Sequence, residues 1–117
     1  MTVTVDQMAR AWRARRSVRA TRAQERARRL EGLLPHARRV LIDAHGAAQV
    51  TLFGSLAVGD CTEHSDVDLA VEGMPKEAHF DALADLMAVF GGPVDLVRLE
   101  DAPPSLVARI VAEGRRL

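Results

Sequence analysis

The first third of the chain has a thin and interrupted pattern of apolar positions. Residues 5–33 contain no proline and no glycine before Gly32, and alanine, arginine, glutamate and leucine dominate them. These residues favour helix, so the segment predicts one long helix. Apolar side chains recur at helical spacing, as at Ala23, Ala27 and Leu30, but arginines interrupt them. We therefore expect a helix that packs weakly.

A proline then marks the start of a second predicted helix. Pro35 suits the first helical turn, where its missing N–H would have no partner, and the helix is expected to stop at Gly46. The short apolar run over residues 50–53 is typical of a buried strand. Gly54 and Ser55 end that strand and are expected to open a short helical turn.

The middle of the chain alternates with a period of two. Between Asp66 and Val71 the pattern places Asp66, Asp68 and Ala70 on one face of a strand and apolar residues on the other. Residues 75–90 have helical spacing, and the predicted core face is Phe80, Leu83, Ala84, Met87 and Phe90. A third strand is predicted over residues 94–99. A final helix follows Pro104, with its core face at Leu106, Ile110 and Val111.

This order of elements predicts an α/β (α+β) fold. Helix, helix, strand, strand, helix, strand and helix favour a small mixed β-sheet with helices packed mainly on one face. The 117 residues suffice for one domain with a single modest core. We expect residues 1–34 to form an Arg-rich helical extension and residues 35–117 to form the domain.

Charge is distributed very unevenly, although the net charge is zero. Residues 1–30 hold nine arginines against Asp6 and Glu25, whereas residues 31–117 hold seven basic and fourteen acidic residues. Such a helix could bind nucleic acid, dock on an acidic partner, or pair with its own acidic domain. The sequence leaves all three explanations open.

Compartment and membrane topology follow from simple counts. The one cysteine, Cys61, excludes an internal disulfide and offers no zinc spacing, which fits a reducing cytosol. No apolar run approaches the roughly 20 residues of a membrane span. The Arg-rich start lacks the serines of a transit peptide and the apolar core of a secretion signal. We expect a cytoplasmic protein without a membrane contact.

Asp66 and Asp68 are the main candidates for chemistry. On one face of a strand their carboxylates would lie about 6–7 Å apart, so both could ligate one cation or bracket two. Magnesium prefers such hard oxygen ligands and shares them with substrate phosphates. Asp95 lies in an apolar run, where an acid needs an explanation. If its strand is a neighbour, it could complete the metal site or accept a proton.

These residues resemble the nucleotidyltransferase superfamily of the DNA polymerase β type, and in particular its minimal bacterial members. The pair Gly54-Ser55 within "LFGS" is followed by ten residues and then by Asp66-Val67-Asp68 within "SDVDLAV". The later "PVDLV" supplies Asp95 as the third acid. The resemblance runs from about Pro35 to Leu117, which makes residues 35–117 a minimal nucleotidyltransferase domain.

The resemblance implies transfer of a nucleoside monophosphate, most simply AMP from ATP, to a hydroxyl with two Mg²⁺ ions and release of pyrophosphate. Asp66, Asp68 and Asp95 would be catalytic and metal-binding, and Gly54 and Ser55 would cradle the triphosphate. It also implies an antitoxin whose partner is an RNA-cutting toxin of the HEPN class, silenced by AMP on a tyrosine.

One departure from the family bears on activity. The family often has arginines between the serine and the next glycine, where this chain has Leu56 and Val58. Each missing charge-assisted hydrogen bond removes about 1.5–3 kcal/mol. Three functions therefore stay open: a transferase that modifies a protein, one that modifies RNA held by the Arg-rich helix, and a silent antitoxin that acts by binding alone. His64, beside the motif, is expected to have no role.

Overall fold

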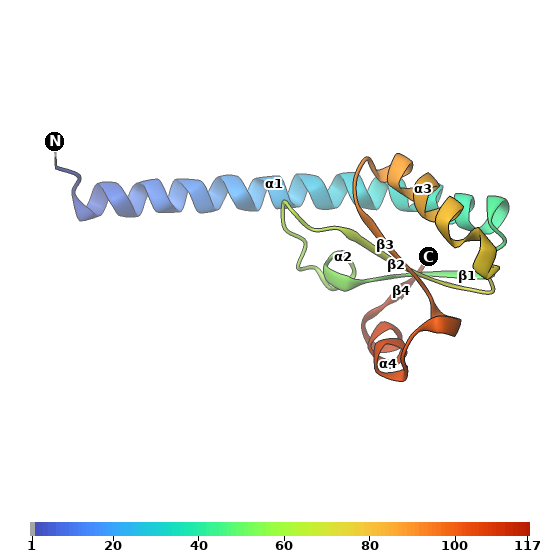
Figure 1. Cartoon of the computed structure of the whole chain (residues 1–117). Helices are drawn as coiled ribbons and strands as arrows, with labels where there is room; N and C mark the ends of the chain where they lie inside the picture. Colours follow the sequence, from blue (N-terminus) through green and yellow to red (C-terminus); the bar gives the residue numbers. More distant parts are fainter. Residues whose placement is uncertain (1) are drawn as a thin grey trace.

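A single long helix, α1 (Val5–Arg39), dominates the outline of the molecule and extends far beyond the rest of it (Figure 1). The computed structural model describes residues 2–117, with extents of 63 × 29 × 20 Å. The helix begins with a capping box, in which the Thr4 side chain accepts from the Gln7 N–H and the Gln7 side chain accepts from the Thr4 N–H. This reciprocal pair satisfies two backbone donors at an exposed helix start.

The predicted break between two helices at Pro35 is wrong. Pro35 lies inside α1, and the helix continues into a short π-helical segment, Val40–Ala44, before it ends near Gly46. A proline inside a helix removes one backbone hydrogen bond. Leu34 and Ala37 on either side of it are buried in the core, so packing offsets that loss. The division into residues 1–34 and 35–117 stays a prediction, although α1 runs across its boundary.

The sheet is mixed, as predicted. Its strands are β1 (Gln49–Phe53), β2 (Val67–Glu72), β3 (Val94–Arg98) and β4 (Arg115–Arg116), in the order β3-β2-β1-β4. Strand β2 is antiparallel to β1 and parallel to β3, and β4 is antiparallel to β1. The sequence did not predict β4, because two arginines carry no apolar pattern.

Helices cover the two faces of the sheet unequally. Helices α1 and α3 (His79–Phe90) lie on one face, and α4 (Pro104–Glu113) lies on the other (Figure 1). The main core fills the space between α1, α3 and the sheet, whereas a smaller cluster of Phe53, Ala70 and Ile110 lies under α4. The prediction of helices mainly on one face is confirmed. No helix in the described part of the chain is both long and apolar enough to cross a membrane.

The core faces of two helices differ from those predicted. Helix α3 buries Ala82, Leu86 and Phe90, while Phe80 is 80% exposed. In α4, Ile110 is buried but Val111 is 75% exposed. The apolar pattern alone did not fix the helix rotation, because α3 starts only after a 3-10 turn, Lys76–Ala78, and apolar side chains occur on both of its sides.

Candidate active site

Two parallel strands bring the predicted acids together. In the register of β2 and β3, Asp68 lies directly opposite Asp95, and residues paired in this way project from the same face of the sheet. Asp66 comes one residue before β2 begins. The structure therefore places all three candidate acids at one end of neighbouring strands, on the face that α4 covers.

The charges of these acids act on one another. Burial is the largest effect that raises the pKa of Asp68 above its ordinary value of 3.8, followed by the charges of Asp95 and of Asp66. Arg109 acts in the opposite direction and lowers it. A half-buried carboxylate next to two others is unfavourable without a positive partner. The three neighbouring carboxylates therefore destabilise the folded state, and a bound cation would relieve their repulsion.

The donor chemistry fits magnesium. Among residues 2–117, no three acidic, histidine or cysteine side chains form a group that would hold a metal ion alone. Mg²⁺, however, is usually held by one or two carboxylates together with water and substrate phosphates. Such an ion takes hard oxygen ligands, and these are offered by Asp66, Asp68 and Asp95. The repulsion that Asp68 experiences from Asp95 and Asp66 also favours a cation at this place.

Asp68→Asn is expected to raise the melting temperature of the metal-free protein at pH 7. Because the pKa of Asp68 is raised in the folded state, stability falls as the pH rises from 3.8 through the raised pKa, and the penalty is complete above it. Asparagine removes this penalty, so its advantage should vanish as the pH falls toward 3.8. Thermal unfolding across pH measures the effect, with Asp43→Asn as an exposed control. An equal gain at every pH would contradict the assignment.

Gly54 lies so close to the Asp68 side chain that any side chain at position 54 would collide with it. Its φ is +73°, and a Cβ placed there would lie 2.1 Å from Oδ2 of Asp68. Strand β1 ends here and α2 (Gly54–Val58) begins, without a side-chain cap on its first N–H groups. These uncapped donors and the Ser55 hydroxyl belong to the turn that packs on Asp68. The predicted glycine-serine turn and the predicted carboxylate are thus in direct contact.

Leu56 has a structural role that its position in the motif conceals. It is buried, at 6% exposure, and belongs to the main core, whereas Val58 is 47% exposed at the end of α2. A side chain at position 56 that packs in the core is not available to a phosphate. The apolar residue there is explained by packing.

Arg109 is a candidate site residue that sequence reasoning missed. It lies on α4 and acts on Asp68, because Ile110, the next residue, packs with Phe53 and Ala70 on the same sheet face. The Arg109 Nε lies 3.5 Å from the Glu113 carboxylate, and its side chain is exposed. The local sequence gives no signal for this role, which depends on how α4 folds back over the sheet. Arg109 brings a positive charge to a site whose α2 turn has none.

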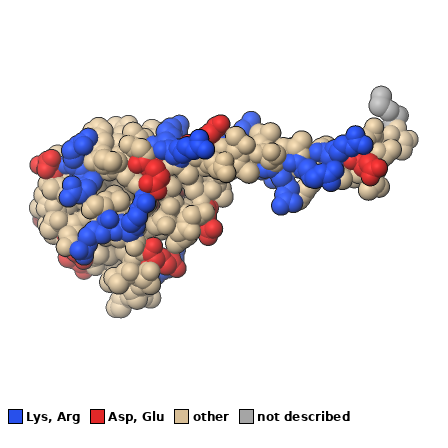
Figure 2. Space-filling model, turned by 180° about the vertical axis from the view of Figure 1, so that it is seen from behind, with Lys and Arg blue, Asp and Glu red and all other residues tan. Residues whose placement is uncertain are grey.

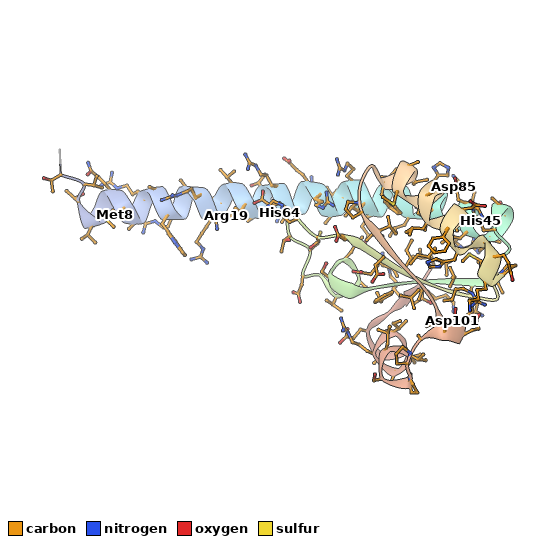
Figure 3. All side chains as sticks on the ribbon, viewed as in Figure 1. Met8, Arg19, His45, His64, Asp85 and Asp101 are labelled. Carbon is orange, nitrogen blue, oxygen red and sulfur yellow. The ribbon has the colours of Figure 1, made fainter. Side chains whose placement is uncertain are left out.

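Helix α1 holds the loop that leads to Asp66. The Arg26 Nε donates to the carbonyl oxygen of Ser65 over 2.7 Å, and Arg22 lies 3.7 Å from the Glu63 carboxylate. The loop is closed by the Thr62 N–H, which donates to the Ser65 hydroxyl over 2.8 Å. His64, beside α1 in Figure 3, is 87% exposed. The helix that the sequence set apart from the domain thus contacts the residue just before Asp66.

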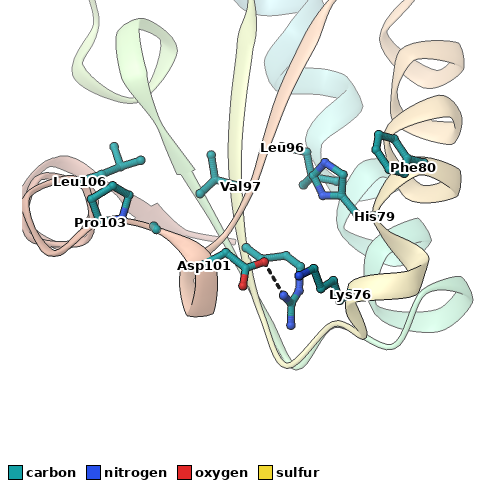
Figure 4. A pocket seen from close by; sticks show the side chains of 10 residues that line it. Lys76, His79, Phe80, Leu96, Val97, Asp101, Pro103 and Leu106 are labelled. Carbon is teal, nitrogen blue, oxygen red and sulfur yellow. Dashed lines mark hydrogen bonds and ion pairs between the residues drawn. The ribbon is translucent and has the colours of Figure 1, made fainter.

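A hollow of about 380 Å³ lies at the open edge of β3 (Figure 4). Most of its exposed lining is apolar. The apolar lining residues are Phe80, Leu96, Val97, Ala102, Pro103 and Leu106, and the others are Lys76, His79, Arg98 and Asp101. Val97 follows Asp95 by two residues, so both project from the same face of the strand. The hollow therefore begins on the same face of β3 as Asp95 and extends toward the far end of the strand; none of the three acids lines it, and its lining suits an apolar group.

The comparisons with known proteins agree with this geometry. The family model described as "Polymerase beta, Nucleotidyltransferase" matches residues 38–117. The chain belongs to this family of polymerase β-type nucleotidyltransferases, which confirms the resemblance drawn from the spacing of Gly54-Ser55 and Asp66-Val67-Asp68. Almost all of α1, residues 5–37, lies outside the match. No curated protein matches the chain.

The chain is similar to several solved structures. A candidate minimal nucleotidyltransferase is 33% identical, with a TM-score of 0.59 over 82% of this chain and 95% of that one. A chain from a mutant MntA-HpeT toxin-antitoxin complex is 31% identical, with a TM-score of 0.59 over 68% of this chain. This protein spans only 66% of that chain. A chain from a toxin-antitoxin complex with AMP-PNP is 26% identical, with a TM-score of 0.61 over 69% of both chains.

Proposed function

We propose that this protein is an antitoxin that transfers AMP from ATP to a hydroxyl of a partner toxin of the HEPN class. The observation that carries the proposal is the set of three acids, with Asp68 opposite Asp95 and in contact with the Gly54 turn. Family membership supports nucleotide transfer. Similarity to chains from toxin-antitoxin complexes, one of them with AMP-PNP, supports the partner and the nucleotide.

Each residue has a distinct part in the proposed reaction. Bound magnesium would be held by Asp66 and Asp68 and would supply positive charge next to the triphosphate. The Gly54 turn and Ser55 would orient the phosphates through backbone N–H groups and a hydroxyl. Arg109 would supply a cationic contact from the α4 side. Asp95, an exposed acid on β3, would accept the proton of the attacking hydroxyl.

The proposed transfer is a displacement at the α-phosphorus of ATP. The oxygen of the acceptor hydroxyl forms a bond to the α-phosphorus of ATP while the bond from that phosphorus to the bridging oxygen of the β-phosphate breaks. Pyrophosphate leaves with the bridging oxygen. The hydroxyl proton passes to Asp95, and the product is a phosphodiester between AMP and the partner.

We assign the hollow beside β3 to the acceptor protein. Most of its exposed lining is apolar, Val97 in it projects from the same face of β3 as Asp95, and an apolar group of the partner placed there would direct a nearby hydroxyl toward the acids. Phe80, at 80% exposure, is the large apolar residue at its rim.

Phe80→Ala is expected to weaken the complex with the acceptor by about tenfold or more, since a buried aromatic anchor contributes at least about 1–2 kcal/mol at an interface. The KM for the acceptor should rise while the KM for ATP stays the same. Val111→Ala, which truncates an equally exposed side chain on α4, is the matched control. Equal losses for the two variants would place the acceptor elsewhere.

The test of the proposed function is transfer of label from α-labelled ATP, with magnesium, to the protein that co-purifies with this chain. Covalent label on that protein supports the proposal. Label on RNA instead would show that the acceptor is a nucleic acid. A co-purifying toxin that is neutralised without any label would show an antitoxin that acts by binding alone.

A further inference from the structure

The first half of α1 extends beyond the domain and meets it only at its far end, where Arg22 lies 3.7 Å from the Glu63 carboxylate. We call residues 5–22 the arm; they span about 27 Å at the helical rise of about 1.5 Å per residue. Except for the half-buried Ala9, every residue of the arm is exposed. In Figures 1 and 3 the arm projects beyond the sheet, with Met8 and Arg19 marking its length. Nothing in the proposed transfer reaction uses this surface.

The charge of the arm is almost wholly unneutralised. Six arginines face one acid, Asp6, and they are Arg10, Arg13, Arg15, Arg16, Arg19 and Arg22. Within residues 2–117, Arg22 is the only one of the six with an acidic side chain within 4 Å. Arg16 instead lies over the ring of Trp12, 5.1 Å from its centroid. Figure 2 shows the basic side chains along the arm. Pairing with its own acidic domain therefore does not explain the arm.

The arginines surround the helix. At about 3.6 residues per turn, Arg13 and Arg15 project about 160° apart, and Arg10 and Arg19 project about 180° apart. An acidic protein surface would meet one side of such a helix and leave the other side unmatched. A groove with phosphates on both walls matches cations on both sides. The major groove of B-form DNA, about 12 Å wide, admits an α-helix of about 10–12 Å diameter.

We propose that the arm binds double-stranded DNA in the major groove through phosphate contacts. The recognised chemistry is a pair of phosphodiester walls, because the six arginines outnumber the neutral side chains of the arm that could hydrogen-bond to base edges, which are Gln7, Trp12, Ser17 and Thr21. Arginines would place the helix by bidentate contacts to phosphate oxygens. Binding of this kind depends on salt, because each phosphate contact releases condensed counterions.

Binding of DNA to the full chain can be followed by the fluorescence of the protein itself. Trp12 is the only tryptophan, is 50% exposed and lies within the arm, so its fluorescence should change when DNA is added. Anisotropy of a short labelled DNA duplex gives the affinity. With five unpaired arginines engaged, the affinity should fall by roughly 500-fold between about 50 and 200 mM salt.

A triple substitution tests the arm itself. Arg13→Gln, Arg15→Gln and Arg19→Gln together should reduce the salt slope by about 0.9 for each phosphate that is no longer neutralised, and should weaken binding at least about tenfold near 100 mM salt. Glutamine keeps the helix favourable, and circular dichroism verifies this. The matched control carries Arg38→Gln, Arg39→Gln and Arg116→Gln, three exposed arginines outside the arm. Its binding should change less than about threefold.

Several results would overturn the proposal. Equal losses for the two triple variants would show that binding does not depend on the arm. Competition by polyglutamate as effective as that by unlabelled DNA would identify an acidic protein as the partner. Tighter binding of duplex RNA would exclude the major groove, because the A-form major groove is too narrow for side chains to read. Tighter binding of single strands would exclude it as well, because a single strand has no such groove. An unchanged Trp12 signal during saturable DNA binding would place the contact elsewhere.

Discussion

Replacing Asp66 and Asp68 together by asparagine is expected to lower AMP transfer by at least about 10³-fold, to the limit of detection. The double variant removes the two carboxylates proposed to hold magnesium, and loss of even one transition-state contact in other enzymes lowers rates by about 10²–10³-fold. Label transfer from α-labelled ATP to the co-purifying toxin, with saturating magnesium, measures the loss. Folding should survive, because substitution at Asp68 relieves the repulsion by Asp95.

The controls separate chemistry from binding. Asp6→Asn with Asp43→Asn removes two exposed acids far along α1 and in the following segment, and transfer should be unchanged. Complex formation by the Asp66→Asn, Asp68→Asn variant should also persist, since the acids are not proposed to anchor the toxin. Full transfer by the double variant would refute the assignment. Full neutralisation of the toxin without transfer would show that binding alone is the antitoxin activity.

The site could be predicted from the sequence because its parts are local. The turn at Gly54 and Ser55 and the pair Asp66 and Asp68 lie within fifteen residues of each other, and their spacing alone carried the family resemblance. Asp95 could be joined to them only on the condition that its strand is a neighbour. The register of β2 and β3 supplies that condition, since it sets Asp68 directly opposite Asp95.

The parts that could not be predicted depend on long-range packing. Arg109 reaches Asp68 only because α4 folds over the sheet through Ile110. A proline breaks most helices, yet here the buried residues around Pro35 keep α1 continuous. Strand β4 consists of Arg115 and Arg116 and pairs with β1 by backbone hydrogen bonds that no side-chain pattern announces. In each case tertiary contacts outweigh the local preference.

Leu56 shows how a motif can mislead on its own. The sequence pattern marked it as the loss of a cation from the phosphate site, whereas the structure buries it in the main core. Charge near the triphosphate would come instead from Arg109 on another element. The same catalytic need can therefore be met from a position that comparison of the local motif does not reveal.

Gly54→Ala is expected to lower AMP transfer by about 10²-fold or more and to destabilise the fold. A Cβ at position 54 would overlap Oδ2 of Asp68 at 2.1 Å, so the carboxylate must move, and displacement by about 1 Å can cost about 10²-fold in rate. The matched control is Gly59→Ala. Gly59 has φ of +84°, but no heavy atom lies within 4 Å of the position that a Cβ would take there, so it carries only the conformational penalty of about 1–2 kcal/mol.

A double-mutant cycle then isolates the contact between glycine and aspartate. Gly54→Ala should be less destabilising in an Asp68→Ala background than in the wild-type protein, because the carboxylate that would overlap the new methyl group is gone and only the Cβ of residue 68, at 3.1 Å, still contacts it. Gly59→Ala should cost the same in both backgrounds. Chemical denaturation of the four variants in each cycle measures the coupling. Strict additivity for Gly54 and Asp68 would show that the close approach of the turn to the carboxylate does not shape the site, and the loss of transfer would then need another cause.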